Sequence, residues 1–342
     1  MKHDNRPLLS RVADSIYWMA RYIERAENVA RYIGVTLQLQ LDLPLARAHQ
    51  WQPLVDTSGD TEDFAERYGD PTQASVIEFL AYDSHNPNSI VSCLRSAREN
   101  ARSVRETISF EMWAQINSMY LNMQAHQSMP EPGRLLDTFR DMRLGCHSFQ
   151  GITDATMTHN EAYHFLRLGR MLERADKTSR ILDVKYFMLL PSARDVGTPY
   201  DDIHWAAVLK SVSGFQMYRQ KYGRLTPRGV VDFLVLDTEF PRSMFHCIRE
   251  SSASLRAITG PPGDAPRFRS EQLLTPICTQ LEDADVDLII GSGLHEYLDK
   301  LQLALNDVDI SFREEFVTQS HLQTQSQSQS QFFVATSTLR KS

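Results

Sequence analysis

The chain has 342 residues, of which 42% are hydrophobic and 23% are charged, as in an ordinary globular protein. Its formal net charge of -7 argues against a general nucleic-acid-binding protein, because such proteins carry a concentrated basic surface. No stretch approaches the roughly 20 apolar residues that cross a bilayer, and the N-terminal segment lacks the apolar core of a signal peptide. We therefore expect a cytoplasmic protein that binds neither nucleic acid nor membrane.

The first predicted element is a long amphipathic helix. Its apolar residues recur at alternating steps of four and three, the spacing of a helix in an antiparallel bundle or coiled coil. They are Val12, Ile16, Met19, Ile23, Ala26, Ala30 and Ile33. A later segment repeats the stripe at Phe165, Leu168, Leu172, Ala175, Ser179 and Leu182. The pattern predicts two long helices that present the same apolar face.

These two helices belong to a longer internal repeat. Residues 15–35 align without gaps on residues 164–184, with identities at six of 21 positions. Residues 51–102 align on 205–256 at a constant offset, with 13 identities in 52 positions. Average residue usage would give about three such identities. The sequence therefore predicts an internal duplication.

Helical patterns cover most of the remaining chain. They run through 87–107, 109–126, 133–157, 203–221, 241–258 and 285–316. Pro87 and Pro241 hold equivalent repeat positions, and we expect each in the first turn of a helix, where an N–H has no intrahelical partner. No run of alternating β-branched residues indicates a sheet. The predicted fold is an all-α, internally duplicated bundle of long antiparallel helices.

One helical domain is expected over residues 1–316, with repeat halves at about 8–130 and 131–316. After Val317 the sequence continues TQSHLQTQSQSQSQ, a polar repeat that cannot bury an apolar core. We therefore predict a disordered Gln/Ser-rich tail at 317–342.

Known chemical motifs are missing from the sequence. The four cysteines show no CxxC spacing, and Cys93 and Cys247 are expected to be small buried side chains. Nucleophile-elbow, phosphate-loop, dinucleotide-binding and zinc-protease motifs are absent as well. We therefore predict no cofactor.

Charged residues recur at matching positions of the two long helices. The first helix carries Arg21, Glu24, Arg25, Glu27 and Arg31, and the second carries Arg170, Glu173, Arg174, Asp176 and Arg180. Neighbours at i,i+3 are Arg21–Glu24 and Arg170–Glu173, and neighbours at i,i+4 are Glu27–Arg31 and Asp176–Arg180. These ten residues are the candidate functional or structural charge network.

Three interpretations of this network are open. The first interpretation is a solvent-exposed ladder of salt bridges, in which each pair contributes about 0.2–0.5 kcal/mol to helix stability. Alternatively, Glu24 pairs with Arg174 and Glu173 with Arg25, so that the network sets the register of two central helices. The third interpretation is an arginine-lined cleft that grips a carboxylate or phosphate in two-pronged fashion. The charged residues differ less between the two copies than the residues of the apolar stripe do. This favours a role for the charges beyond keeping the protein soluble.

A metal site has one pair of candidates. Glu161 and His164 have the Glu-x-x-His spacing of ferritin-like di-iron bundles. Their first-copy counterparts are Val12 and Ser15, and the chain contains no second Glu-x-x-His. We therefore predict no metal site. The remaining histidines are scattered, and a lone histidine on a helix is more often a hydrogen-bonded structural residue than a ligand.

Three segments carry a resemblance to a known family: LLSRVADSIYWMARYIERAENVAR, NPNSIVSCLRSARENARSVRE and LRLGRMLERADKTSRILDVKY. Together they resemble the bacterial alpha-E family, an all-helical domain of unknown function named for its repeated Glu-Arg motif. The resemblance covers roughly residues 7–316, and the motif maps onto Glu24-Arg25 and Glu173-Arg174. It implies a neighbourhood with ATP-grasp ligases and transglutaminase-like proteases, and thus a part in making or modifying a peptide.

We accordingly expect a non-catalytic partner or substrate-presenting subunit of an ATP-grasp peptide ligase, with a transglutaminase-like protein as a further partner. The alternative is a stand-alone enzyme, metal-dependent or using Glu24 or Glu173 as acid or base on an anionic peptide or amide. Acid–base catalysis requires a carboxyl group whose pKa lies near the working pH.

Overall fold

The computed structural model describes residues 8, 10–42, 51–125, 130–188, 199–260 and 268–318. These residues form helices joined by turns, with no β-strand among them, which confirms the predicted all-α class. No helix in these ranges combines the length and the apolar content needed to cross a membrane. The tail predicted at 317–342 lies outside the described residues, apart from Val317 and Thr318.

The elements follow one another in two series. The first is α1 (Ser10–Asp42), α2 (Gln52–Ser58), α3 (Thr61–Tyr68), α4 (Gln73–Ile77), the π-helical turn η1 (Glu78–Tyr82), α5 (Ile90–Ser103), α6 (Phe110–Ala125), the 3-10 turn η2 (Pro132–Arg134) and α7 (Leu135–Thr156). The second is α8 (Glu161–Met188), α9 (Pro199–Ser211), α10 (Phe215–Tyr222), α11 (Pro227–Val235), α12 (Met244–Thr259), α13 (Arg269–Glu282), α14 (Val286–Gly291), α15 (Leu294–Arg313) and the π-helical turn η3 (Glu314–Thr318).

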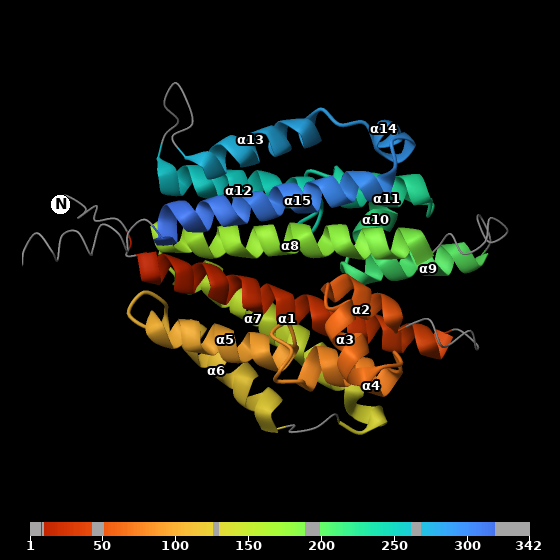
Figure 1. Ribbon diagram of the computed structural model, residues 1–342, viewed down its shortest axis with the longest axis horizontal. Coiled ribbons are helices and arrows are strands. Elements are labelled where there is room, and N and C mark those ends of the chain that lie inside the picture. Colours follow the sequence, from red (N-terminus) through yellow and green to blue (C-terminus); the bar gives the residue numbers. More distant parts are fainter. Residues whose placement is uncertain are drawn as a thin grey trace, which may run out of the picture.

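The two longest helices, α1 and α8, lie side by side in the middle of the bundle and run in the same direction (Figure 1). Each is flanked by helices that run the opposite way, α5 and α7 beside α1, and α12 and α15 beside α8. The helices that contain the aligned residues thus hold corresponding places around the centre. The duplication itself stays a prediction from the sequence.

The predicted apolar stripes form the core around this central pair. Every residue of both stripes is buried, including Ser179, which replaces an apolar residue in the second copy. Cys93 on α5 and Cys247 on α12 are also fully buried, as predicted. The alternating three-and-four spacing therefore identifies the packed faces of α1 and α8 correctly.

A glycine permits the close approach of the two central helices. A Cβ added to Gly169 on α8 would lie 2.5 Å from the carbonyl oxygen of Tyr17 on α1, well inside van der Waals contact. Further along, the Tyr32 hydroxyl donates to the Lys177 carbonyl oxygen at 3.1 Å. Backbone and side chains therefore touch directly along this interface.

Several helix boundaries differ from the prediction. The segments 203–221 and 285–316 each contain two helices, because turns at Ser213–Gly214 and Ser292–Gly293 interrupt them. Gly293 has a φ of 98°, in the region that favours glycine. The short helices α2, α3, α4, α11 and the longer α13 were not predicted.

The expected role of the two prolines is wrong. Pro87 and Pro241 precede their helices, since α5 begins at Ile90 and α12 at Met244. The hydroxyls of Ser89 and Ser243 cap these helices by accepting from the backbone N–H three residues on. The serine caps thus define the helix starts.

Candidate functional site: a buried ion-pair interface

The first cluster of the interface surrounds Glu24 of α1. Arg174 of α8 donates from Nε and Nη2 to the two Glu24 oxygens at 2.9 and 2.8 Å. Arg242, directly before the Ser243 cap of α12, donates from Nη1 to Glu24 Oε1 at 2.8 Å. Burial alone would raise the pKa of Glu24, but the two arginines outweigh it and lower the pKa to about 2.

Glu27, one turn further along α1, belongs to the same cluster. Its carboxylate accepts from Arg31 at i,i+4, as the sequence predicts, and from Arg242 Nη2 at 2.9 Å. His147 of α7 donates from Nε2 to Glu27 Oε1 at 3.1 Å. Burial opposes ionisation, yet Arg242 and Arg31 hold the pKa of Glu27 well below its usual value. Arg242 therefore bridges two buried carboxylates.

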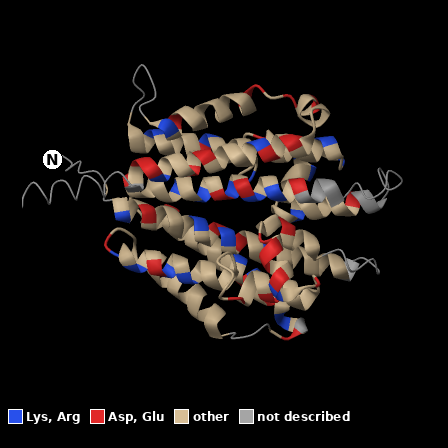
Figure 2. Cartoon of the chain, in the orientation of Figure 1, with Lys and Arg blue, Asp and Glu red and all other residues tan. Residues whose placement is uncertain are grey.

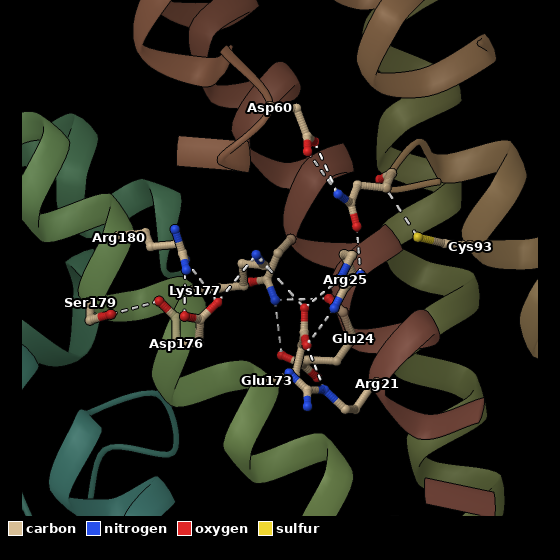
Figure 3. A network of polar contacts seen from close by, with 12 residues as sticks. Arg21, Glu24, Arg25, Asp60, Cys93, Glu173, Asp176, Lys177, Ser179 and Arg180 are labelled. Carbon is tan, nitrogen blue, oxygen red and sulfur yellow. Dashed lines mark hydrogen bonds and ion pairs between the residues drawn. The ribbon is translucent and has the colours of Figure 1, made fainter. Parts of the chain in front are cut away.

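The second cluster surrounds Glu173 of α8, whose side chain is fully buried (Figure 3). Arg25 donates to both Glu173 oxygens, at 2.7 and 3.0 Å, and Arg21 Nε donates to Oε2 at 2.9 Å. Lys177 Nζ lies 3.8 Å from Oε1. Burial opposes ionisation here too, but Arg25, Arg21 and Lys177 together hold the pKa of Glu173 well below normal.

Neighbouring elements complete the second cluster. Asp309 of α15 accepts from Arg21 Nη1 at 2.6 Å and from the Tyr17 hydroxyl. On the other side, Asn88 accepts from Arg25 Nη1 at 2.6 Å and donates to Asp60. Charged residues thus recur along α8 in the middle of the molecule (Figure 2), and Arg170, Glu173 and Arg174 among them are buried.

Asp176 and Arg180 form the predicted i,i+4 pair, with Arg180 Nε 2.9 Å from Asp176 Oδ1 (Figure 3). Lys177 Nζ lies 3.2 Å from the other Asp176 oxygen. This pair joins the second cluster through Lys177.

The structure therefore distinguishes among the three interpretations. The predicted contacts Glu24–Arg174 and Glu173–Arg25 are present. Both glutamates and Arg174 are buried and Arg25 is only 15% exposed, so these pairs do not form a solvent-exposed ladder. The i,i+3 pairs Arg21–Glu24 and Arg170–Glu173 do not form in the described residues, since each glutamate faces the arginines of the opposite helix. A binding role for the network stays a prediction.

Arg170 differs from the other arginines of the interface. Only 8% of its surface is exposed, and its Nε is buried without a hydrogen-bond partner. No ion pair joins it to any described residue within 4 Å. Burial and the neighbouring Arg174 both lower the pKa of Arg170. Its aligned counterpart Arg21 pairs with both Glu173 and Asp309.

The two metal-ligand candidates, Glu161 and His164, contact different groups. Glu161 accepts a hydrogen bond from the Leu8 backbone N–H, whereas His164 packs edge-on against Tyr163. Over the described ranges, no group of three or more His, Cys, Asp or Glu side chains is arranged to hold a metal ion.

A groove of about 350 Å³ lies elsewhere, between α6 and α7. Its lining includes Met119, Met123, Met142, Arg134 and Asp137. None of the ten predicted network residues lines this groove. The charged interface is consequently a feature of the packed centre and not of this hollow.

Sequence reasoning missed several members of the interface, namely Arg242, Lys177, Asp309, His147 and Asn88. Arg242 and Asn88 are themselves equivalent at the constant repeat offset, but their side chains differ, so a search for identities passes over them. The useful signal was position in the repeat rather than identity.

Comparisons with known proteins agree with the helical fold. Residues 8–317 match the model of the Alpha-E family, described as a predicted alpha-helical domain with a conserved ER motif. Uncharacterized proteins of Mycobacterium bovis and Mycobacterium tuberculosis are each 22% identical over 87% of this chain. The match spans 36% of those relatives, which are therefore much longer. No solved structure matches the chain.

Proposed function

We propose that this chain, which belongs to the Alpha-E family, acts as a non-catalytic partner or substrate-presenting subunit of an ATP-grasp peptide ligase. In this role the paired charges of α1 and α8 hold a rigid central frame. The outer helices are then free to contact the ligase or its peptide.

The pairing of the central glutamates is the observation that carries this proposal. A general acid or base works best with a pKa near the operating pH, and the pKa of Glu24 is about 2. Arg174 and Arg242 occupy its oxygens, and Glu173 is similarly bound by Arg21 and Arg25. Neither carboxylate is poised to exchange a proton near neutral pH, which favours a non-catalytic role for the two glutamates.

The buried cysteines support the same conclusion. Burial raises the pKa of the Cys93 thiol to about 12, and that of Cys247 equally to about 12. The thiolate is the nucleophilic form, so both side chains are poor nucleophiles near neutral pH. These two residues are best explained as packing groups.

The length of the relatives also supports a partner role. Their matching region is about a third of a longer chain, so a domain of this kind occurs there joined to further sequence. A helical unit that works beside a catalytic domain fits this arrangement, whether the two are fused or separate.

Co-expression with the ATP-grasp protein of the same organism tests the proposal. We expect a complex of defined stoichiometry by size exclusion with light scattering, and peptide-dependent ADP release that requires both proteins. An ATP-grasp protein that forms no complex and turns over equally well alone would contradict it.

Exposed leucines on opposite parts of the bundle offer matched variants for mapping the contact. Leu144 on α7 and Leu303 on α15 are 54% and 58% exposed, so Leu144→Asp and Leu303→Asp should leave the fold intact. Loss of the complex in one variant and not in the other would identify the docking side.

The enzyme alternative has a separate test. The isolated chain is incubated with acidic peptides and amides, beside Glu24→Gln and Glu173→Gln. We expect no turnover by any of the three. Turnover that survives purification and disappears in a folded glutamine variant would support the enzyme instead.

A further inference from the structure

Arg170 is a largely buried arginine, and its Nε has no hydrogen-bond acceptor among the residues that the structure describes. It lies on α8 where that helix meets α1 and α7, close to Glu24, Asp154, Tyr163 and Arg174. Burying a charge without a partner is unfavourable, so such a group is retained only where something offsets the penalty.

The neighbouring anions are already engaged. The Glu24 oxygens accept from Arg174 and Arg242, and Gln150 Nε2 adds a contact at 3.2 Å. Asp154 accepts from the Tyr163 hydroxyl at 3.2 Å, and no ion pair connects it with Arg170. Because Asp154 is exposed, this side of the interface borders solvent.

The aligned position shows what a satisfied arginine looks like in this fold. Arg21 donates to Glu173 at 2.9 Å and to Asp309 at 2.6 Å, using both sides of its fork. Arg170 occupies the matching place on α8 without such contacts. Arg21 therefore has carboxylate partners within the protein, whereas the Nε of its aligned counterpart Arg170 has none among the described residues.

We propose that Arg170 binds a carboxylate supplied from outside the chain. A planar guanidinium matches a carboxylate through two parallel hydrogen bonds. Glu24 and Asp154 add negative charge nearby, which disfavours a phosphate dianion relative to a singly charged carboxylate. A peptide C-terminus and an acidic side chain both present this group. The site goes beyond the partner role proposed above and does not depend on it.

The experiment uses thermal unfolding of the purified full chain with matched probes. These are acetate, the peptide Ala-Ala-Ala with a free C-terminus, the same peptide as its C-terminal amide, and inorganic phosphate, all at constant ionic strength. We expect saturable increases in Tm, of roughly 2–4 °C at high occupancy, with the free-acid peptide and with acetate. The amide should produce none. A response to the peptide but not to acetate would identify a peptide C-terminus as the source, whereas equal responses would indicate any carboxylate.

Variants separate binding from folding. Arg170→Met should abolish the carboxylate response and raise the ligand-free Tm, because it removes an unpaired buried charge. Arg21→Met should lower the ligand-free Tm and keep the response, because Arg21 has internal acceptors. Arg170→Lys keeps the charge without the planar fork, and carboxylate binding should weaken at least tenfold.

Four outcomes would overturn the proposal. A fall in Tm for Arg170→Met as large as that for Arg21→Met would make Arg170 a structural residue. An equal response to the free acid and the amide would exclude carboxylate recognition. A stronger response to phosphate would assign the site to a different anion. If Asp154 were the true acceptor, Asp154→Asn would lower Tm and no carboxylate would raise it.

Discussion

Arg174 and Glu24 face each other in a two-pronged contact, with Nε and Nη2 at 2.9 and 2.8 Å from the two carboxylate oxygens, and both side chains are buried. The pair joins α8 to α1 across 150 residues of sequence. Charge-assisted contacts of this geometry are among the stronger hydrogen bonds in proteins, but they offset a large desolvation penalty. Breaking one partner should therefore be more harmful than the net value of the pair suggests.

A double-mutant cycle tests this relationship. Glu24→Gln should lower the free energy of unfolding by about 3–5 kcal/mol, because it leaves Arg174 with an uncompensated charge. Combined with Arg174→Met, the losses should be non-additive by about 0.5–3 kcal/mol in urea unfolding. Glu99→Gln is the control, since Glu99 pairs with Arg102 at the surface and should change stability by less than about 1 kcal/mol.

The two clusters should behave independently of each other. Glu24 and Glu173 share no hydrogen-bond or ion-pair partner among the described residues. We expect the losses from Glu24→Gln and Glu173→Gln to add within about 0.5 kcal/mol in the double variant. A coupling as strong as that between Glu24 and Arg174 would show that the clusters form one unit.

Acid should destabilise the protein through these glutamates. The pKa of Glu24 falls from its ordinary value of 4.5 to about 2 in the folded chain. A depressed folded pKa contributes stability that is complete above about pH 5 and is lost as the pH falls toward 2. Urea unfolding at a series of pH values should show this decline, with a shallower slope for Glu24→Gln. Equal slopes would mean that Glu24 does not contribute.

Gly169→Ala tests the close helix approach. The added Cβ would meet the Tyr17 carbonyl oxygen at 2.5 Å, so α1 and α8 must separate, at about 1–3 kcal/mol. Gly34→Ala on α1 is the matched control, because nothing lies within 4 Å of its added Cβ. This control should gain roughly 0.5–1 kcal/mol from helix propensity. Similar behaviour of both variants in thermal unfolding would contradict the contact.

Arg242 and Asn88 form a second matched pair. Arg242→Met removes an ion-pair partner from both Glu24 and Glu27. It should therefore lower the free energy of unfolding by about 3–5 kcal/mol. Asn88→Ala removes one neutral acceptor from Arg25 and should lose about 1–3 kcal/mol. Chemical denaturation ranks the two. The reverse order would show that Arg242 is not the bridge between the carboxylates.

The central helices were predictable because local pattern and packing agree there. Periodicity identifies the buried faces of α1 and α8, and the matching charges of the two helices predict the contacts Glu24–Arg174 and Glu173–Arg25. The i,i+3 expectation failed for Arg21 and Glu24 because tertiary partners outcompete a weak local pair.

Other features depend on contacts that sequence spacing does not encode. Asp309 reaches Arg21 only because α15 packs beside the central pair. The turn before α10 places Gly214 against Phe240, and an added Cβ there would lie 2.9 Å from the ring, so the position favours glycine. Arg170 has no partner for its Nε because the nearby Glu24 and Asp154 bind other side chains, and residue spacing does not encode those contacts.

The long separation between partners in the interface affects how the protein is made. The two arginines that bind Glu24 are synthesised after it, Arg174 150 residues later and Arg242 218 residues later. At about 5–20 residues per second, a ribosome needs roughly 10–40 seconds to deliver Arg242. During that interval α1 carries carboxylates that cannot enter a dry core. The N-terminal half therefore cannot complete its interior until α12 has emerged from the ribosome.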